Sequence, residues 1–168
     1  MDIIFRLGLN DPQVFIYGFD RPNLRFFVRS GLSIKDRQQE TVRIIKTLTG
    51  SGIVYVRTIE ETDQFAKLLN EEGISAQAYH SKLNEKRSQI QDDFMENRYK
   101  VIVATIAFGM GVDKADIRFV IHMGMPESLE GYYQEAGRAG RDGAIAYCIL
   151  LHSGRDVGIH HYFLKNSR

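Results

Sequence analysis

Short apolar runs alternate with amphipathic stretches along most of this chain, and the alternation limits the folds open to it. The apolar runs have the length of buried strands and occupy residues 24–28, 53–56, 74–79, 101–104, 119–122 and 144–151. Apolar residues at helical spacing mark the segments between them, at residues 36–48, 58–73, 84–97 and 128–137. Strands that alternate with helices build a parallel sheet with helices on both faces. The sequence therefore predicts an α/β fold.

Capping residues support several of these boundaries. Thr58 and Glu61 have the spacing of a capping box, in which each side chain bonds a free amide at the start of the helix. Gly73 is expected to end that helix, because glycine adopts the left-handed conformation without strain. Asn84 is expected to be the N-cap of the next helix, and residues 153–164 are expected to form a last one.

Length, charge and cysteine content bound the class of protein. The 168 residues suit one domain with a substantial core. The formal net charge is +1, so any nucleic-acid binding must come from local placement of Lys and Arg. A single cysteine, Cys148, excludes an intrachain disulfide and a multi-cysteine zinc site in this chain. No apolar run has the length of a membrane span and no signal peptide is apparent, so we expect a cytosolic protein without membrane contact.

The start of the chain differs from the rest. Turn residues around Pro12 and a short possible strand at 14–17 do not form an independent unit. We interpret residues 1–18 as a connecting segment that arrives from elsewhere, and residues 19–168 as the domain.

A glycine-rich stretch near the C-terminus carries two arginines, Arg138 and Arg141, with Gln134 one turn upstream. If the helix at 128–137 forms, the three side chains are spaced to lie along one face near its end. A guanidinium is a planar fork of donors that matches phosphate oxygens, and the interleaved glycines leave room around it. The alternative is that both arginines pair with Asp142, with Glu135 or with helix-end carbonyls and only close the helix.

Three predicted strands end in hydroxyl or imidazole side chains. The residues at these ends are Thr58, His80, Ser81 and Thr105. Ligands bind beyond the carboxyl ends of strands in such sheets, and helix N-termini there offer free amides to phosphates. A nucleic-acid strand could lie along this edge, held phosphate by phosphate. The structural alternative is an N-cap role for Thr58 and a loop role for His80.

The loop after residues 101–104 contains Gly-Met-Gly at 109–111, but Lys114 stands where a dinucleotide-binding motif needs its third glycine. Asp113 in this loop could accept a ribose hydroxyl or hold a basic group, and the alternative is local pairing with Lys114 or Arg118. No glycine is followed by lysine, so this chain has no P-loop. Phosphate-seeking arginines without a phosphate cradle should complete a site begun elsewhere.

Motif-sized segments of the chain resemble one family, the RecQ DNA helicases. They resemble the start of its second motor lobe, motif IV, the short motif after it, motif V and motif VI, and occupy residues 19–23, 53–58, 79–80, 104–122 and 132–143. Motif V here includes Ala-Phe-Gly-Met-Gly-Val-Asp-Lys, and motif VI reads Gln-Glu-Ala-Gly-Arg-Ala-Gly-Arg-Asp-Gly. The resemblance extends over nearly everything from Phe19 to the C-terminus.

The resemblance implies a RecA-like lobe, the second of two, with ATP and Mg²⁺ held mainly by a first lobe that this chain lacks. Arg138 and Arg141 would reach the γ-phosphate as arginine fingers, and Gln134 would lie near the attacking water. Asp113 would contact the nucleotide ribose or couple the two lobes, and Gly111 would contact the nucleotide. Positive charge where the transition state spreads negative charge is what phosphoryl transfer requires.

The same resemblance implies partners and context. Single-stranded DNA would contact the strand-end set, Thr58, His80, Ser81 and Thr105, and duplex DNA would be unwound in the 3′–5′ direction. Residues 1–18 would connect to the first lobe. The protein would work in the bacterial nucleoid, or in the nucleus of a eukaryote. The family's zinc-binding and winged-helix modules would lie downstream, outside this chain, and the isolated chain should hydrolyse no ATP.

The chain departs from the family pattern at two positions. Lys82 replaces a usual glycine and Ala115 a usual proline. Two alternatives compete with the helicase interpretation. One is a non-catalytic nucleic-acid-binding module, which would not require Gln134, Arg138 and Arg141. The other is an RNA helicase lobe, disfavoured because motif VI here lacks the His-Arg pair common in those enzymes.

Overall fold

Six parallel strands form one sheet at the centre of the protein. The computed structural model describes residues 20–105, 113–154 and 156, with the isolated positions 6, 8, 10 and 13. The strand order is β1-β6-β5-β2-β4-β3, and every pair is parallel. The strands are β1 Leu24–Arg29, β2 Ser51–Tyr55, β3 Ala76–Tyr79, β4 Val101–Ala104, β5 Ile117–His122 and β6 Ala146–Leu151. The predicted α/β fold is confirmed.

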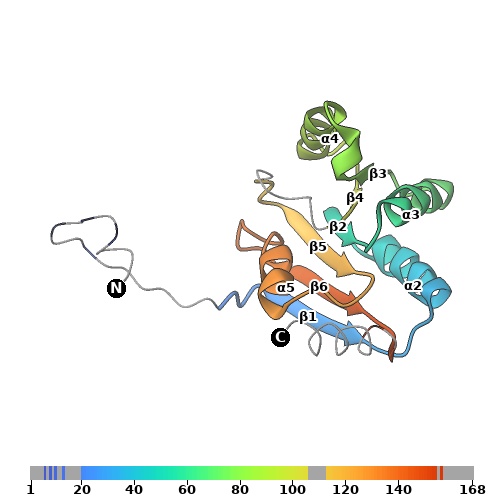
Figure 1. The fold of residues 1–168 in the computed structure, drawn as a ribbon, viewed down its shortest axis with the longest axis horizontal. Helices are drawn as coiled ribbons and strands as arrows, with labels where there is room; N and C mark the ends of the chain where they lie inside the picture. The colour runs from blue at the N-terminus through green and yellow to red at the C-terminus, as the bar shows by residue number, and fades with distance from the viewer. Residues whose placement is uncertain are drawn as a thin grey trace.

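Helices cover both faces of the sheet (Figure 1). On one face lie α2 (Ile34–Thr47) and α3 (Ile59–Glu71), and on the other α4 (Lys86–Met95) and α5 (Leu129–Ala136). Each face buries its own apolar cluster, with Phe65 of α3 in the first and Phe94 of α4 in the second. The central strands are buried on both sides, which explains their continuous apolar runs.

Helix caps confirm one prediction and correct another. The Thr58–Glu61 capping box is present: the Thr58 hydroxyl accepts from the Glu61 amide at 3.2 Å and the Glu61 carboxylate accepts from the Thr58 amide at 3.3 Å. The prediction of Asn84 as an N-cap is wrong. A short 3-10 helix, η1 (Ser81–Leu83), follows β3, and Asn84 adopts a positive φ of 45° between η1 and α4. Asparagine tolerates that conformation, which is why it can occupy a turn as readily as a cap.

The parallel arrangement gives the sheet two different edges. All strands begin at one edge, the amino edge, and end at the other, the carboxyl edge. Thr105 follows β4 at the carboxyl edge, whereas Asp113 lies just before β5 at the amino edge. The connection between β5 and β6 contains α5 and returns the chain from the carboxyl edge to the amino edge (Figure 1). The residues that follow α5 therefore lie at the edge opposite to the strand ends.

Several other predictions concern single residues or the two ends of the chain. Cys148 is fully buried, as expected for a small core residue, and its thiol contacts the Ala136 carbonyl at 3.7 Å. Among the described residues, no helix combines the length and apolar content that a membrane crossing requires. The connecting segment at 1–18 and the last predicted helix at 153–164 lie largely outside the described residues, so both stay predictions.

Candidate functional site

The two arginines lie at the amino edge, in a turn that follows α5. Helix α5 ends at Ala136, so Arg138 and Arg141 stand beyond the helix and not along one of its faces. The backbone of this turn is bonded to the segment at the start of β5: the Gly140 amide donates to the Ile117 carbonyl at 2.9 Å. We call residues 137–143 the arginine turn. The sheet therefore fixes the position of the backbone that carries the two arginines.

Arg141 is partly exposed and forms an ion pair. Its guanidinium lies 2.6 Å from the Asp113 carboxylate, with the Arg141 side chain 38% and the Asp113 side chain 83% exposed. The partners considered for Asp113 are engaged elsewhere, because Lys114 pairs with Asp116 and Arg118 pairs with Asp142. An exposed ion pair is weakly held, so a ligand with greater negative charge can displace Asp113 from Arg141.

Arg138 points inward. It is half-buried, and its guanidinium hydrogen-bonds to the Tyr55 hydroxyl at the end of β2. Burial raises the pKa of the Tyr55 hydroxyl well above its ordinary value, and the positive charge of Arg138 only partly opposes this. Tyr55 therefore stays protonated and offers its oxygen as an acceptor. Gln134, in the last turn of α5, is exposed.

A buried polar cluster joins the sheet to α5 next to Arg138. His122, the last residue of β5, lies 2.7 Å from the Glu135 carboxylate through Nε2. Its ring stacks on Tyr55 at 5.0 Å between centroids and meets Tyr132 edge-on at 4.9 Å. Because the Glu135 carboxylate can only accept, we assign the donated proton to Nε2, and Nδ1 has no hydrogen-bond partner among the described residues. Burial also raises the pKa of Tyr132 to about 12.

The carboxyl edge gathers the predicted strand-end residues. Strands β2, β4 and β3 are neighbours there, so the ends that carry these residues lie side by side. Thr58 and Ser81 are exposed and Thr105 is partly exposed. His80 differs: its side chain is only 7% exposed, and Nε2 lies 3.4 Å from an Asp63 carboxylate oxygen.

The carboxyl edge also holds a cation that was not predicted from the sequence. Arg57 is 39% exposed and pairs with Asp156 at 2.9 Å, while the buried Arg37 pairs with the same carboxylate at 3.0 Å. Burial alone would raise the pKa of Asp156, but hydrogen bonds from Ser153 and the charges of both arginines lower it overall. Asp156 thus stays charged and holds Arg57 at the edge. The place of Arg57 just after a predicted strand was the signal available in the sequence.

Four more residues near the arginines were not predicted as site residues. Arg21 and Asn23, which lie in the predicted start of the lobe, contact the arginine turn. Tyr55 and His122 lie in predicted strands and in segments that resemble the family, and neither was given a role in a site. Gly111 lies outside the described residues. Within the described part of the chain, no group of three or more His, Cys, Asp or Glu side chains could hold a metal ion.

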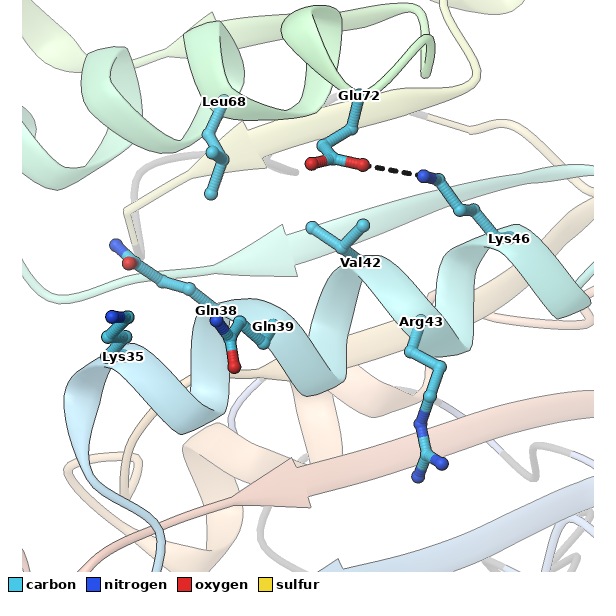
Figure 2. A pocket seen from close by; sticks show the side chains of 8 residues that line it. All are labelled: Lys35, Gln38, Gln39, Val42, Arg43, Lys46, Leu68 and Glu72. Carbon is cyan, nitrogen blue, oxygen red and sulfur yellow. Dashed lines mark hydrogen bonds and ion pairs between the residues drawn. The ribbon is translucent and has the colours of Figure 1, made fainter.

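A groove of about 470 Å³ separates α2 from α3 (Figure 2). Lys46 crosses it to pair with Glu72 at 2.6 Å, and Val42 and Leu68 supply apolar surface. Its lining residues are Lys35, Gln38, Gln39, Val42, Arg43, Lys46, Leu68 and Glu72. The groove contains none of the predicted site residues, and we assign it no function.

Comparison with known proteins identifies the family of this chain. Residues 36–143 match the family described as helicase conserved C-terminal domain. The chain belongs to this family. It is 40% identical over 164 residues to the ATP-dependent DNA helicase RecQ of Pasteurella multocida, across 97% of this chain and 26% of that protein. It is 46% identical over 159 residues to the ATP-dependent DNA helicase hus2/rqh1 of Schizosaccharomyces pombe, across 92% of this chain and 12% of that protein.

Among solved structures, the E. coli DEAD-box protein SrmB, bound to the regulator of ribonuclease activity A, is similar to this helicase domain. The TM-score is 0.71 at 26% identity, and the match covers 78% of each chain. The comparisons confirm the RecQ resemblance and the RecA-like fold. This helicase domain spans about a quarter or less of the length of the two curated relatives.

The two carboxylates near the arginines should contribute differently to stability. Replacing buried Glu135 by alanine leaves the His122 donor unpaired, so we expect the free energy of unfolding to fall by about 1–3 kcal/mol. Asp113→Asn should leave the urea midpoint unchanged, because its ion pair is exposed. Glu130→Ala, an exposed site on α5, is the matched control. A loss for Asp113→Asn equal to that for Glu135→Ala would make the Arg141 pair structural.

Proposed function

We propose that this domain is the second motor lobe of an ATP-dependent 3′–5′ DNA helicase of RecQ type. It supplies arginine fingers to ATP bound by a first lobe, and contacts to single-stranded DNA. The observation that carries the proposal is Arg141: a partly exposed guanidinium, on a turn fixed to the sheet, whose ion pair is with an exposed carboxylate. Such a group can bind a phosphate presented by a facing lobe.

In this proposal the nucleotide replaces Asp113 as the partner of Arg141. A γ-phosphate carries more charge than one carboxylate and accepts a bidentate fork of donors. Asp113, once released, is free to accept a ribose hydroxyl, with Gly111 close by in sequence. Gln134 is exposed in the last turn of α5, just before the arginine turn, and would orient the attacking water. Mg²⁺ would bind with ATP on the first lobe.

Arg138 has a different part in the proposal. Its guanidinium is oriented by the Tyr55 hydroxyl, so it would act from a preset position. Preorganised charge aimed at developing negative charge needs no rearrangement during the reaction, which is where its catalytic value lies. The two arginines thus have different roles: Tyr55 holds Arg138 in place beside the sheet, whereas Arg141 can leave Asp113 and follow the ligand.

The carboxyl edge would carry the single-stranded DNA. Thr58, Ser81 and Thr105 present hydroxyl groups there, and Arg57 adds a positive charge. His80 is buried, so within this proposal it would act at the edge of the DNA path and hold the β3–η1 junction through Asp63. Backbone contacts of this kind position a strand without reading its sequence.

In this proposal ATP and DNA bind at opposite edges of the lobe, and closure of the two lobes couples ATP hydrolysis to movement along DNA. The arginine fingers reach ATP only when the two lobes close, so chemistry would depend on closure. The same dependence predicts that the isolated chain hydrolyses no ATP. An enzyme of this kind would act on chromosomal DNA, in the bacterial nucleoid or in a nucleus.

Arg141→Ala in the complete two-lobe protein tests the nucleotide site. We expect the DNA-stimulated kcat for ATP to fall by about a thousandfold with nucleotide affinity largely kept, because the guanidinium acts on the transition state. Arg43→Ala removes another exposed, carboxylate-paired arginine, on α2, and should leave kcat unchanged. Wild-type turnover in Arg141→Ala would remove this residue from the mechanism. Steady-state ATPase assays with DNA and with RNA make the comparison and show which nucleic acid stimulates turnover.

Arg57→Gln tests the DNA edge in the isolated chain. A phosphate contact contributes about one unit to the slope of log affinity against log salt, so the slope should fall by about 1 with weaker binding at low salt. Asp156 keeps Arg37 as its partner in this variant, which protects the fold. Arg98→Gln, an exposed arginine on the loop between α4 and β4, is the control. Equal losses for both variants, measured by fluorescence anisotropy, would rule out a DNA path along the carboxyl edge.

A further inference from the structure

The side chain of Arg21, at the start of the domain, hydrogen-bonds to the backbone of the arginine turn. The Arg21 guanidinium donates to three carbonyls of the turn, at 3.3 Å to Gly137, 3.0 Å to Ala139 and 2.8 Å to Gly140. These residues lie 116, 118 and 119 positions from Arg21 in sequence. One planar donor group thus holds together the turn between α5 and β6.

Asn23, two residues after Arg21, also hydrogen-bonds to this turn. Its side-chain amide donates to the Gly140 carbonyl at 2.8 Å and to the Ala144 carbonyl at 2.9 Å. The backbone carbonyl of Asn23 accepts from the Ala146 backbone amide at 3.0 Å, at the start of β6. Asn23 is therefore anchored in the sheet edge and cannot follow the turn if the turn moves.

Gly140 is the residue that lets both side chains approach. Its φ is +57°, and a Cβ on it would lie 2.5 Å from Asn23 Nδ2 and 2.8 Å from the Ala144 carbonyl oxygen. Any side chain would push Asn23 away. The glycine thus serves the close approach of Asn23, which differs from the expectation that the glycines clear space around the guanidinium groups.

Two of the bonded carbonyls, those of Gly137 and Gly140, belong to the peptide units that precede the two arginines. The Gly137 carbonyl shares a planar peptide unit with the Arg138 amide, and the Gly140 carbonyl shares one with the Arg141 amide. Holding these two units restricts the direction in which each arginine side chain leaves the backbone. We propose that Arg21 and Asn23 are positioning residues that aim Arg138 and Arg141 at the nucleotide. This inference rests on the proposed function of the two arginines.

Arg21 and Asn23 could also serve only to close the end of a helix, and another residue of the fold, Lys100, has that role. Cations commonly bind the free carbonyls at a helix C-terminus, and Lys100 does so for α2, donating to Ile45 at 3.0 Å and to Leu48 at 2.7 Å. Lys100 is far in sequence from the arginine turn and lies beside another helix. It therefore provides a control for the loss of a helix-closing cation without an effect on the arginines.

The test compares Arg21→Lys, Asn23→Asp and Lys100→Met in the complete two-lobe protein. Lysine keeps the charge but cannot reach three carbonyls, and aspartate keeps the shape of Asn23 but removes its donors. For both we expect DNA-stimulated kcat to fall about ten- to a hundredfold, with the KM for ATP within about twofold. Lys100→Met should lower the melting temperature without lowering kcat at a temperature where all variants are folded.

Arg141→Ala, alone and combined with Arg21→Lys, separates the two proposals. If Arg21→Lys lowers the residual kcat of Arg141→Ala by a smaller factor than it lowers the wild-type kcat, Arg21 acts through the arginines. Wild-type kcat in both Arg21→Lys and Asn23→Asp, or an equal kcat loss in Lys100→Met, would overturn the positioning role while leaving the proposed function intact. Wild-type turnover in Arg141→Ala would instead overturn the proposed function. Should Arg21→Lys fail to fold, Asn23→Asp decides the question.

Discussion

Parallel pairing of all six strands is the constraint on which the rest of this structure depends. It places the amino ends of all strands at one edge and their carboxyl ends at the other, so residues just before a strand and residues just after one lie at opposite edges. The hydroxyl-bearing strand ends and Arg57 consequently share one edge, and the arginine turn occupies the other. A lobe built this way presents two separate surfaces, which the proposed function assigns to ATP and to DNA.

The two edges are connected through a buried polar cluster. Tyr55 and His122 end β2 and β5 at the carboxyl edge, yet their side chains contact Arg138 and Glu135 on the segment that leads to the amino edge. Polar groups are expensive to bury unless they are paired, so a cluster of this kind in an otherwise apolar core is maintained by its mutual contacts. It supplies a direct physical path from the strand ends to one arginine.

The alternation of apolar runs predicted the sheet and its helices because burial on both faces fixes the composition of central strands. The cap at Thr58 was predicted correctly because a capping box is a local interaction. The inward direction of Arg138 and the burial of His80 depend on residues far away in sequence, Tyr55 and the packing of α3, so local patterns could not reveal them. The prediction for Asn84 failed for a related reason, since its turn conformation is set by the path from β3 to α4.

In the mechanism proposed above, this lobe delivers positive charge to a nucleotide held by a neighbouring lobe. The most direct measurement is a crystal structure of the complete two-lobe protein with ADP, magnesium and aluminium fluoride, a mimic of the transferring phosphate. We expect Arg141 to have left Asp113 and to lie about 3 Å from a fluoride, with Arg138 beside it. A closed structure in which Arg141 remains paired with Asp113 and turned away from the nucleotide would contradict the mechanism.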